Sequence, residues 1–397
     1  MEYMLPHLGE RALLERMVDV VLTTKFLGFE LRSPLVAASG PPTRDLDSIR
    51  QLVDAGVGAA ITKTILLEPS TNPRPCMFRG ERLFLNTERC STLPLSTWID
   101  EQLPGLAELP IPIIASIGMT PEDAEALARP VVDAGADMLE LSIFTPYDDP
   151  SPMLEAIQRV KSTVSVPILV KLSCNVHDPV EFARRLKGSG ADAISAIDAL
   201  KAGLVLDPQT GRPSMLEQGF GRVSGEAIKP IALYHVAQLA HYVDLPIVGT
   251  GGVMTATDAL EMLYCGAQTV GLCTSLIVEG PAYVRKTNDE LEKLLLEVGA
   301  SSVSDVRGRT LSFIDFTEDT DERREYEKRV WGRTTRTAKI SPEVCKRCDR
   351  CFQVCPYHAI ERPGEAYNVV SDRCQGCGLC VSICPVSAIA FVEEEEE

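Results

Sequence analysis

The 397-residue sequence lacks three features that would each point to a different class of protein. Its apolar runs all stay short of the ~18 residues that a membrane-spanning helix needs. Basic residues are in the minority, since 39 Lys and Arg face 56 Asp and Glu and give a formal net charge of −17. Phosphate binding requires clustered Lys and Arg, so we do not expect nucleic acid as a partner. A G-x-G-x-x-G unit for binding NAD(P) is also missing.

The N-terminal stretch MEYMLPHLGERALLERMVDVV carries scattered charges and no small-residue cleavage site. A secretion signal is therefore not expected, and neither is a membrane partner. We expect a cytoplasmic protein. The simplest interpretation of its excess negative charge is that this charge contributes to solubility.

Cysteine, in contrast, is abundant and unevenly placed. Eight of the 13 cysteines fall in two runs, CKRCDRCFQVCP (345–356) and CQGCGLCVSICP (374–385). Each run matches C-x₂-C-x₂-C-x₃-C-P, the bacterial two-cluster spacing, in which the fourth cysteine of one run ligates the cluster of the other. Zinc is the alternative, but two complete runs each closed by Pro favour two [4Fe–4S] clusters.

The spacing predicts the ligand set of each cluster: Cys345, Cys348, Cys351 and Cys384 for the first, and Cys374, Cys377, Cys380 and Cys355 for the second. This module resembles a two-cluster ferredoxin over its whole length. We expect the remaining five cysteines to be small, buried or half-buried residues: Cys76, Cys90, Cys174, Cys265 and Cys273. Such clusters pass single electrons, so the rest of the chain should hold a group, commonly flavin, that converts them into a two-electron reaction.

Short β-branched runs alternate with amphipathic stretches from about residue 33 to 296. The predicted strands are 33–39, 58–64, 112–118, 136–142, 167–173, 191–197, 245–251 and 267–273. Several follow a Gly that suits a left-handed helix C-cap, as in VVDAGAD (131–137). Eight strand–helix units most economically close as a (β/α)₈ barrel, an α/β fold, with a doubly wound open sheet as the alternative.

We predict three parts along the chain. Residues 1–315 form the barrel, and 316–338 form a helical linker that contains the charged stretch EDTDERREYEKRVWGR. Residues 339–397 form an α+β bacterial-type ferredoxin domain that ends in an acidic tail of five Glu.

The ends of the predicted strands carry residues suited to a ligand, because barrels bind their ligands at the carboxyl ends of the strands. GTGG (249–252) and LCTS (272–275) end strands seven and eight, where backbone N–H groups can bind a phosphate. Lys63 and Lys171 end strands two and five. Buried lysine is rare unless paired, so each is either a functional cation or half of a salt bridge to a loop carboxylate.

These stretches resemble the FMN-binding barrel of the dihydroorotate dehydrogenase family. The resemblance runs from about 22 to 310 and rests on SPLVAASGP, TKT with NPRP, LNTERC, the Lys171 strand, GRVSGEAIKPIAL and GTGG. Within that family, a barrel continued by a two-cluster ferredoxin is similar to the catalytic subunit of bacterial dihydropyrimidine dehydrogenase. The resemblance implies an oxidoreductase that acts on CH–CH bonds.

The resemblance also implies a set of FMN contacts: Ala38, Ser39 and Thr64 along the ring; Lys63, Lys171 and Ser116 at its polar edge; and Ser224, Gly225, Gly251, Gly252, Cys273, Thr274 and Ser275 around the ribityl phosphate. Asn86 matches a family asparagine that binds the substrate.

The sequence departs from the family where a pyrimidine would be held. The family's Asn-x-Ser-Cys/Ser-Pro at strand four is replaced by Ser142-Ile143-Phe144-Thr145-Pro146, and an Asn-Thr or Asn-Ser pair at strand six by Asp198-Ala199. Amides both donate and accept, and a pocket built for them loses affinity when they are replaced. We therefore expect a substrate other than a standard pyrimidine, contacted by Asn86, Ser142 and Asp198.

The proton donor should come from the loop after strand four. Thr145 occupies the position of the family's Cys or Ser, and Tyr147 and then Asp148 are the competing donors; a solvated turn is the alternative for Thr145 and Tyr147. Asp198 is expected to bind substrate or to pair with Lys171 or Lys201.

Three functions remain open from sequence. The first is reduction, or the reverse oxidation, of a polarised C=C bond, and the second is electron transfer inside a larger flavoprotein complex. A dihydropyrimidine dehydrogenase with an altered pocket is the third. We expect an NAD(P)H-dependent flavoprotein subunit or a soluble ferredoxin as electron donor, a small-molecule substrate, and an oligomer.

Overall fold

The computed structural model describes residues 20–143, 149–173, 175–176, 178–214, 216–316, 336–362, 364 and 366–393. The chain divides into two compact units, with the division between Ile314 and Asp315. Most of the predicted linker, at 317–335, and the end of the acidic tail, at 394–397, lie outside the described residues.

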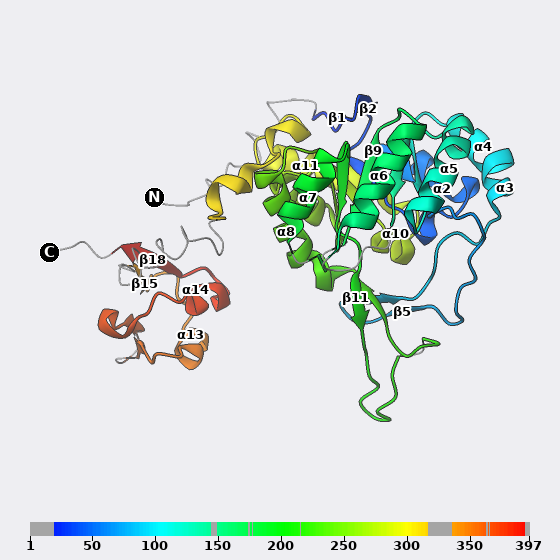
Figure 1. Cartoon of the computed structure of the whole chain (residues 1–397). Coiled ribbons are helices and arrows are strands. Elements are labelled where there is room, and N and C mark those ends of the chain that lie inside the picture. Colours follow the sequence, from blue (N-terminus) through cyan, green and yellow to red (C-terminus); the bar gives the residue numbers. More distant parts are fainter. Residues whose placement is uncertain are drawn as a thin grey trace. The chain divides into compact units, whose positions relative to one another are not determined.

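The larger unit is a closed barrel of eight strands, each paired in parallel with its neighbours (Figure 1). In chain order the strands are β3 (Leu35–Ala37), β4 (Ala59–Ile61), β7 (Ile113–Ile117), β8 (Met138–Leu141), β9 (Ile168–Leu172), β10 (Ala193–Ala196), β13 (Ile247–Thr250) and β14 (Thr269–Leu272). Every one lies within a strand predicted from the sequence. The predicted (β/α)₈ barrel is confirmed, and the open sheet is wrong because β3 pairs with both β14 and β4.

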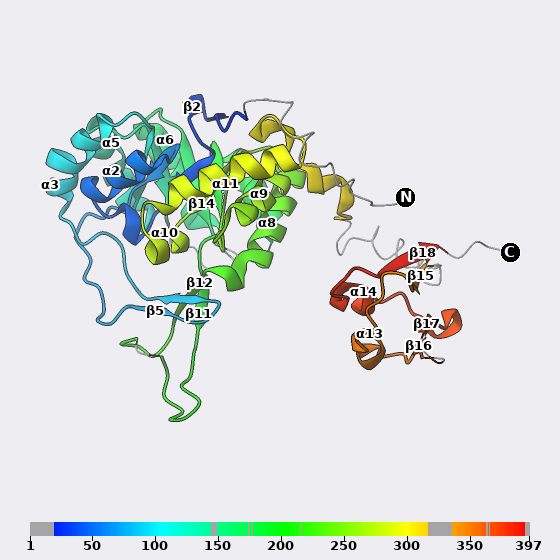
Figure 2. The ribbon, with the colours of Figure 1, turned by 180° about the vertical axis from the view of Figure 1, so that it is seen from behind.

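Helices surround the strands on the outside of the barrel (Figures 1 and 2). They are α2 (Leu46–Ala55), α3 (Leu95–Thr97), α4 (Leu103–Ala107), α5 (Pro121–Asp133), α6 (Ser151–Thr163), α7 (Pro179–Gly188), α8 (Lys229–Tyr242), α9 (Ala256–Tyr264), α10 (Thr274–Glu279) and α11 (Tyr283–Glu297). Their starts are fixed locally: the side chains of Asp45, Thr120, Asp178 and Thr255 each accept a hydrogen bond from a backbone N–H in the first turn.

A two-stranded hairpin covers the amino-terminal end of the barrel. It consists of β1 (Thr24–Phe26) and β2 (Phe29–Leu31). Phe26 and Leu31 are almost fully buried against inward-facing barrel side chains such as Val36 and Ile114. This end is therefore filled with apolar side chains, and ligands can enter only at the opposite end.

An antiparallel sheet borders that opposite end. Its strands, in sheet order, are β11 (Leu200–Gly203), β12 (Gly221–Ser224), β6 (Phe84–Asn86) and β5 (Met77–Arg79). Figures 1 and 2 both show this sheet at the end of the barrel away from β1 and β2. It comes from the insertions after β4 and β10, and it extends the wall of the barrel mouth.

The smaller unit is an α+β domain. β15 (Arg336–Ile340) pairs with β18 (Ile389–Glu393), β16 (Ile360–Glu361) pairs with β17 (Asn368–Val369), and the helices are α13 (Arg350–Val354) and α14 (Leu379–Ile383). Ala338, Ile340, Ile360, Tyr367 and Ile389 form its apolar core, and six of the eight motif cysteines pack against that core.

No helix within the described ranges is long and apolar enough to cross a membrane.

A substitution of Gly58 tests how closely the chain segments at β3 and β4 pack. This glycine precedes β4, and a Cβ built there would collide with the backbone carbonyl oxygen of Ser33. We predict that Gly58→Ala lowers the free energy of unfolding by about 1–3 kcal/mol. Gly188→Ala is the matched control, because nothing lies within 4 Å of its Cβ position at the end of α7.

The control should be neutral or stabilising by up to about 1 kcal/mol. Urea unfolding of the full chain, followed by circular dichroism, measures both variants. Equal stability of the two variants would contradict the close packing at Gly58.

Candidate functional site

A cavity of about 710 Å³ opens at the carboxyl ends of the barrel strands. That volume lies within the range of small-molecule and cofactor sites. Its floor includes Glu140 from β8, Lys171 from β9, Ser195 from β10 and Gly271 from β14, and Lys63 lies just after β4. The antiparallel sheet contributes part of the wall.

Most of the residues predicted from sequence meet in this cavity. The predicted FMN residues that line it are Ala38, Ser39, Lys63, Thr64, Lys171, Ser224, Gly251, Gly252, Cys273 and Thr274, and the predicted substrate residues Asn86, Ser142 and Asp198 line it too. Ser116, Gly225 and Ser275 do not. Ser116 contacts a residue of the cavity wall instead: its Oγ lies within hydrogen-bond distance, 3.0 Å, of Thr64 Oγ1.

The predicted proton donors Thr145 and Tyr147, and Asp148 with them, lie outside the described residues. β8 ends at Leu141 and α6 begins at Ser151, so the predicted loop connects these two elements. Of its described residues, Ser142 reaches the cavity.

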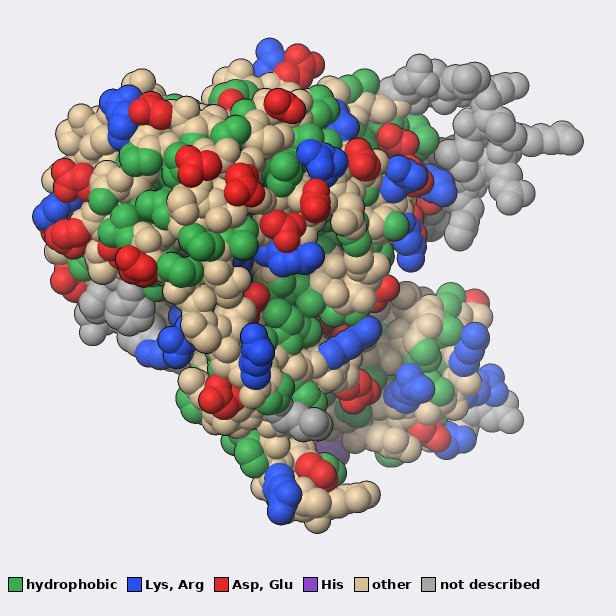
Figure 3. Space-filling model, turned by 90° about the vertical axis from the view of Figure 1, so that its right-hand side faces the viewer, with side chains coloured by type: hydrophobic (Ala, Val, Ile, Leu, Met, Phe, Trp, Pro, Cys, Tyr) green, Lys and Arg blue, Asp and Glu red, His purple; other side chains and the backbone are tan. Residues whose placement is uncertain are grey.

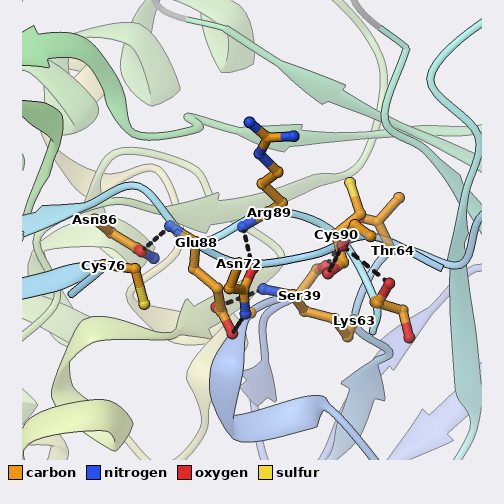
Figure 4. A network of polar contacts seen from close by, with 12 residues as sticks. Ser39, Lys63, Thr64, Asn72, Cys76, Asn86, Glu88, Arg89 and Cys90 are labelled. Carbon is orange, nitrogen blue, oxygen red and sulfur yellow. Dashed lines mark hydrogen bonds and ion pairs between the residues drawn. The ribbon is translucent and has the colours of Figure 1, made fainter. Parts of the chain in front are cut away.

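Lys63 is held by an acidic residue that the sequence interpretation did not single out. Its Nζ donates to Glu88 Oε2 at 2.6 Å, and both side chains are about nine-tenths buried. Asn72 Nδ2 donates to the other carboxylate oxygen of Glu88 at 3.3 Å. Figure 4 shows Lys63 and Asn72 pointing toward the Glu88 carboxylate. The salt bridge to a loop carboxylate is therefore present, and it lies in the cavity wall.

The side-chain amide of Asn86 already makes one hydrogen bond within the protein. Its side-chain oxygen accepts from the backbone N–H of Glu88 at 2.6 Å (Figure 4). The amide N–H₂ group of Asn86 can donate to a ligand, and its oxygen keeps a second lone pair that can accept. Asn86 can therefore recognise a carbonyl or carboxylate oxygen.

Lys171 pairs with a carboxylate on the neighbouring strand. Its Nζ lies 3.1 Å from Oε1 of Glu140, a side chain with no exposed surface. Burial lowers the pKa of the Lys171 ammonium, but the carboxylates of Glu140 and Asp198 raise it by more, so that the pKa is raised overall. Lys171 is therefore a cation at neutral pH, fixed at the floor of the cavity.

Asp198 has an ion pair with Arg222 of β12, at 3.7 Å. The sequence interpretation named only Lys171 and Lys201 as partners, and it missed Arg222 because β12 comes after the long insertion that follows β10. Asp198 still acts on Lys171, whose pKa it helps to raise. Both side chains of the Asp198–Arg222 pair are substantially exposed, so they remain accessible to a ligand.

Sequence reasoning also missed Glu88 and Glu140. Glu140 did give a signal, because an acidic residue inside the apolar strand MLEL needs a partner when it is buried. Its Oε1 is paired with Lys171, whereas its Oε2 lacks a hydrogen-bond donor among the described residues, as does the buried Oγ of Ser195. These unpartnered polar atoms line the cavity and are suited to a polar ligand.

The walls at β13 and α10 form a narrow backbone cradle. Gly251 and Gly252 have φ values of +111° and +78°, and a Cβ on Gly252 would lie 2.6 Å from the backbone N of Lys229. Across the cradle, Thr274 Oγ1 and Ser224 Oγ are 2.9 Å apart. Glycine backbone and hydroxyl groups together are suited to a phosphate.

The thiols at the cavity are neutral. Burial raises the pKa of Cys273 to about 11, against the opposing effect of Lys171 and Lys63. Burial also raises the pKa of Cys90. Since the thiolate is the nucleophilic form, neither cysteine is prepared for covalent catalysis.

The smaller unit collects its cysteines into two separate sites. One is lined by Cys345, Cys348, Cys351 and Cys384, and the other by Cys355, Cys374, Cys377 and Cys380. These are the two predicted sets. Within the described part of the chain, no three metal-binding side chains converge on a single ion. Four cysteines at each site suit a [4Fe–4S] cluster, whose cysteines bind different iron atoms.

Backbone N–H groups point at three of these sulfurs. Arg347 N lies 3.4 Å from Cys345 Sγ, Ala388 N lies 3.2 Å from Cys384 Sγ, and Ala359 N lies 3.3 Å from Cys355 Sγ. Such hydrogen bonds stabilise cluster-bound thiolates.

Comparison with known proteins agrees with this geometry. The family model described as dihydroorotate dehydrogenase matches residues 21–295. The chain belongs to the dihydroorotate dehydrogenase family. A second model, a 4Fe-4S dicluster domain, matches residues 338–391. The recognition from sequence of the family and of the two-cluster domain is confirmed, and so are the cofactors: the barrel binds FMN and the smaller unit binds two [4Fe–4S] clusters.

Curated relatives resemble the barrel rather than the whole chain. The catalytic subunit of dihydroorotate dehydrogenase B (NAD⁺) from Methanothermobacter thermautotrophicus is 34% identical over 300 residues, which cover 72% of this chain and 98% of the relative. A putative dihydroorotate dehydrogenase A (fumarate) from Solibacter usitatus is 34% identical over 305 residues, or 74% and 99% of the two chains. This protein is therefore an FMN oxidoreductase of that family with an added iron–sulfur domain.

The charge of Lys171 can be tested through Glu140. In Glu140→Gln the effect of burial on Lys171 dominates, so its pKa should fall below its ordinary value. The wild-type pair, with a raised pKa, stabilises the fold at neutral pH and loses this effect only as pH rises through that pKa. The variant should lose about 3–5 kcal/mol at pH 7.

Because the folded variant would bind fewer protons at Lys171 than the unfolded chain, its stability should recover as pH rises from about 7 to 10. Urea unfolding across this range measures it. Asp244→Asn, which breaks the exposed Lys187–Asp244 pair, is the control and should change stability by less than about 1 kcal/mol at any pH. A flat pH profile for Glu140→Gln would contradict the assignment.

Cluster ligation predicts iron content. Cys348→Ala and Cys377→Ala should each lower the iron of the anaerobically purified protein from about eight to about four atoms per chain, because each removes one ligand of a different cluster. Cys265→Ala, in the barrel, should leave it unchanged. Iron and acid-labile sulfide analysis measures all three, and unchanged iron in Cys348→Ala would contradict the ligand sets.

Proposed function

We propose that this protein reduces a polarised C=C bond next to a carbonyl or carboxylate group, or catalyses the reverse oxidation, on a substrate other than a standard pyrimidine. The observation that carries the proposal is the wall of the cavity beyond the predicted FMN contacts. Among the described residues that line it, Asn86 and Gln218 carry the side-chain amides, and ionic side chains such as Glu88, Asp198 and Arg222 accompany them.

A pyrimidine presents alternating donors and acceptors that amide side chains can match. Asn86 offers its N–H₂ group as a donor, while its oxygen already accepts one hydrogen bond, from Glu88 N. Buried polar groups left without a partner reduce affinity for the wrong ligand by as much as about 10⁴-fold. The cavity therefore favours a substrate oxygen that accepts from Asn86 and a charged or strongly polar group near Asp198 and Arg222.

When bound, FMN exchanges hydride with carbon, and the clusters exchange single electrons with a partner. The residues of this chain bind and orient the flavin and the substrate, and they protonate the substrate. Lys63 and Lys171 hold two positive charges at the cavity wall, each fixed by a carboxylate, and so stabilise negative charge that develops on a bound ring or substrate.

The proton in this proposal comes from Thr145, with Tyr147 as the competing donor. In the sequence both lie between β8 and α6, and Thr145 is the residue that the family resemblance matches to a Cys or Ser. A hydroxyl is a weak acid, so the donor must be oriented by its neighbours to contribute.

The electron donor is either a soluble ferredoxin or an NAD(P)H-dependent flavoprotein subunit. The two cluster sites support this proposal because they exchange single electrons, and the sequence has no G-x-G-x-x-G unit of its own for a nicotinamide.

Anaerobic discharge of the reduced protein tests the function. The holoprotein is reduced chemically and mixed with open-chain enoates, cyclic enones, unsaturated cyclic amides, uracil, thymine and orotate, while flavin absorbance is followed. At least one α,β-unsaturated carbonyl compound outside the pyrimidines should reoxidise the flavin. Discharge by orotate or uracil alone would contradict the proposal, and discharge by none would favour an electron-transfer subunit.

Once an acceptor is known, Thr145→Ala should lower turnover by about 10²–10³-fold and leave FMN bound, since only the proton donor is lost. Tyr147→Phe removes the competing hydroxyl and should have a much smaller effect. Turnover and flavin content are measured on both variants. Unchanged turnover in Thr145→Ala, with loss in Tyr147→Phe, would transfer the role to the tyrosine.

A further inference from the structure

The two cluster sites of the smaller unit have the same backbone plan but different charges. In the first site the loop 346–350 contains Lys346, Arg347, Asp349 and Arg350. In the second site the corresponding loop 375–379 reads QGCGL and contains no charged residue. Arg350 and Leu379 occupy matching places, since each is the first residue of the helix that follows its loop.

Asp349, the single acidic residue of the first loop, is engaged by neighbouring side chains. Asp349 pairs with Arg362 at 3.3 Å and accepts a hydrogen bond from the hydroxyl of Tyr367. Lys346 and Arg350 are exposed, and within the described residues neither takes part in an ion pair. Both line the site of the first cluster, and the cysteine between them, Cys348, is exposed. The first cluster therefore approaches the surface beneath a cationic loop.

This cationic loop stands out in a chain whose formal net charge is −17. On the face of the barrel unit in Figure 3, acidic and basic side chains are interspersed rather than separated. At physiological ionic strength the Debye length is about 8 Å, so a protein that meets the loop responds to its local charge more than to the distant acidic surface.

We infer that the loop Lys346–Arg350 is the docking surface for a small acidic protein that carries one electron. The inference rests on the proposed function, which requires an external reductant. In each encounter the reduced carrier loses one electron to the chain and leaves oxidised, and two encounters supply the two electrons of one C=C reduction. Complementary charge selects such a partner and accelerates its association. The uncharged loop 375–379 is not used for this contact.

Matched variants of the two loops test the docking surface. Lys346→Gln with Arg350→Gln, and Gln375→Glu with Leu379→Glu, change the net charge by the same −2 at corresponding positions. A plant-type [2Fe–2S] ferredoxin of net negative charge is the probe, and a basic c-type cytochrome is the probe of opposite charge. Binding to the anaerobic holoprotein is measured at about 50 and about 500 mM salt, together with the stopped-flow rate of electron transfer.

Wild-type protein should bind the acidic ferredoxin at low salt and lose this binding at high salt. The first variant should bind it about 10-fold more weakly at low salt with little salt dependence, and the second should match the wild type. Equal weakening in both variants, greater weakening in the second, salt-insensitive binding as in a stable flavoprotein subunit, or preference for the cytochrome would each overturn the inference.

Measurement of the iron content checks that each variant retains both clusters. If the Lys346→Gln, Arg350→Gln variant loses a cluster, Lys346→Glu alone replaces it. This single variant should also weaken binding of the acidic probe. Binding is measured without substrate, so a failure of the proposed C=C reduction leaves this result interpretable. Loss of carrier binding in the first variant with unchanged flavin discharge to an acceptor would support both statements separately.

Discussion

Charge burial at the mouth of the barrel is the constraint on which the site depends. Two largely buried lysines, Lys63 and Lys171, lie in the cavity wall, and an unpaired buried ammonium is costly. The fold meets this cost with Glu88 for Lys63, at 2.6 Å, and with Glu140 for Lys171, at 3.1 Å. Each pair keeps a cation charged and in place beside the cavity. A buried pair of this kind adds little net stability, so its retention in the cavity suits a role in binding.

The cavity wall has one part that suits the cofactor of the family and another part that is specific to this chain. The cradle at Gly251 and Gly252 and the paired lysines are suited to FMN, which the family binds. In the rest of the wall, Asn86 follows the family resemblance, whereas Asp198, just after β10, stands where the resemblance implies an amide, and it pairs with Arg222. A cofactor site retained beside an altered substrate wall is the structural reason for proposing a different substrate.

Sequence predicted the fold well because its signals are local. Each barrel strand is a short apolar run, and the motif cysteines fix their grouping by spacing alone. The ion-pair partners were missed because the insertions after β4 and β10, not sequence proximity, bring them together: Glu88 lies 25 residues after Lys63, and Asp198 meets Arg222 of β12. Thr145 and Tyr147 remain predictions, as they lie outside the described residues.

The central claim is that one chain combines two one-electron centres, in its smaller unit, with one two-electron centre, in the barrel cavity. Anaerobic reductive titration of the holoprotein, with cluster and flavin absorbance followed together, tests it most directly. We predict an uptake of about four electrons per chain, two at the clusters and two at the flavin, and release of all of them to an acceptor that reoxidises the flavin. Uptake of about two electrons, or clusters that stay reduced while the flavin is reoxidised, would contradict this coupling.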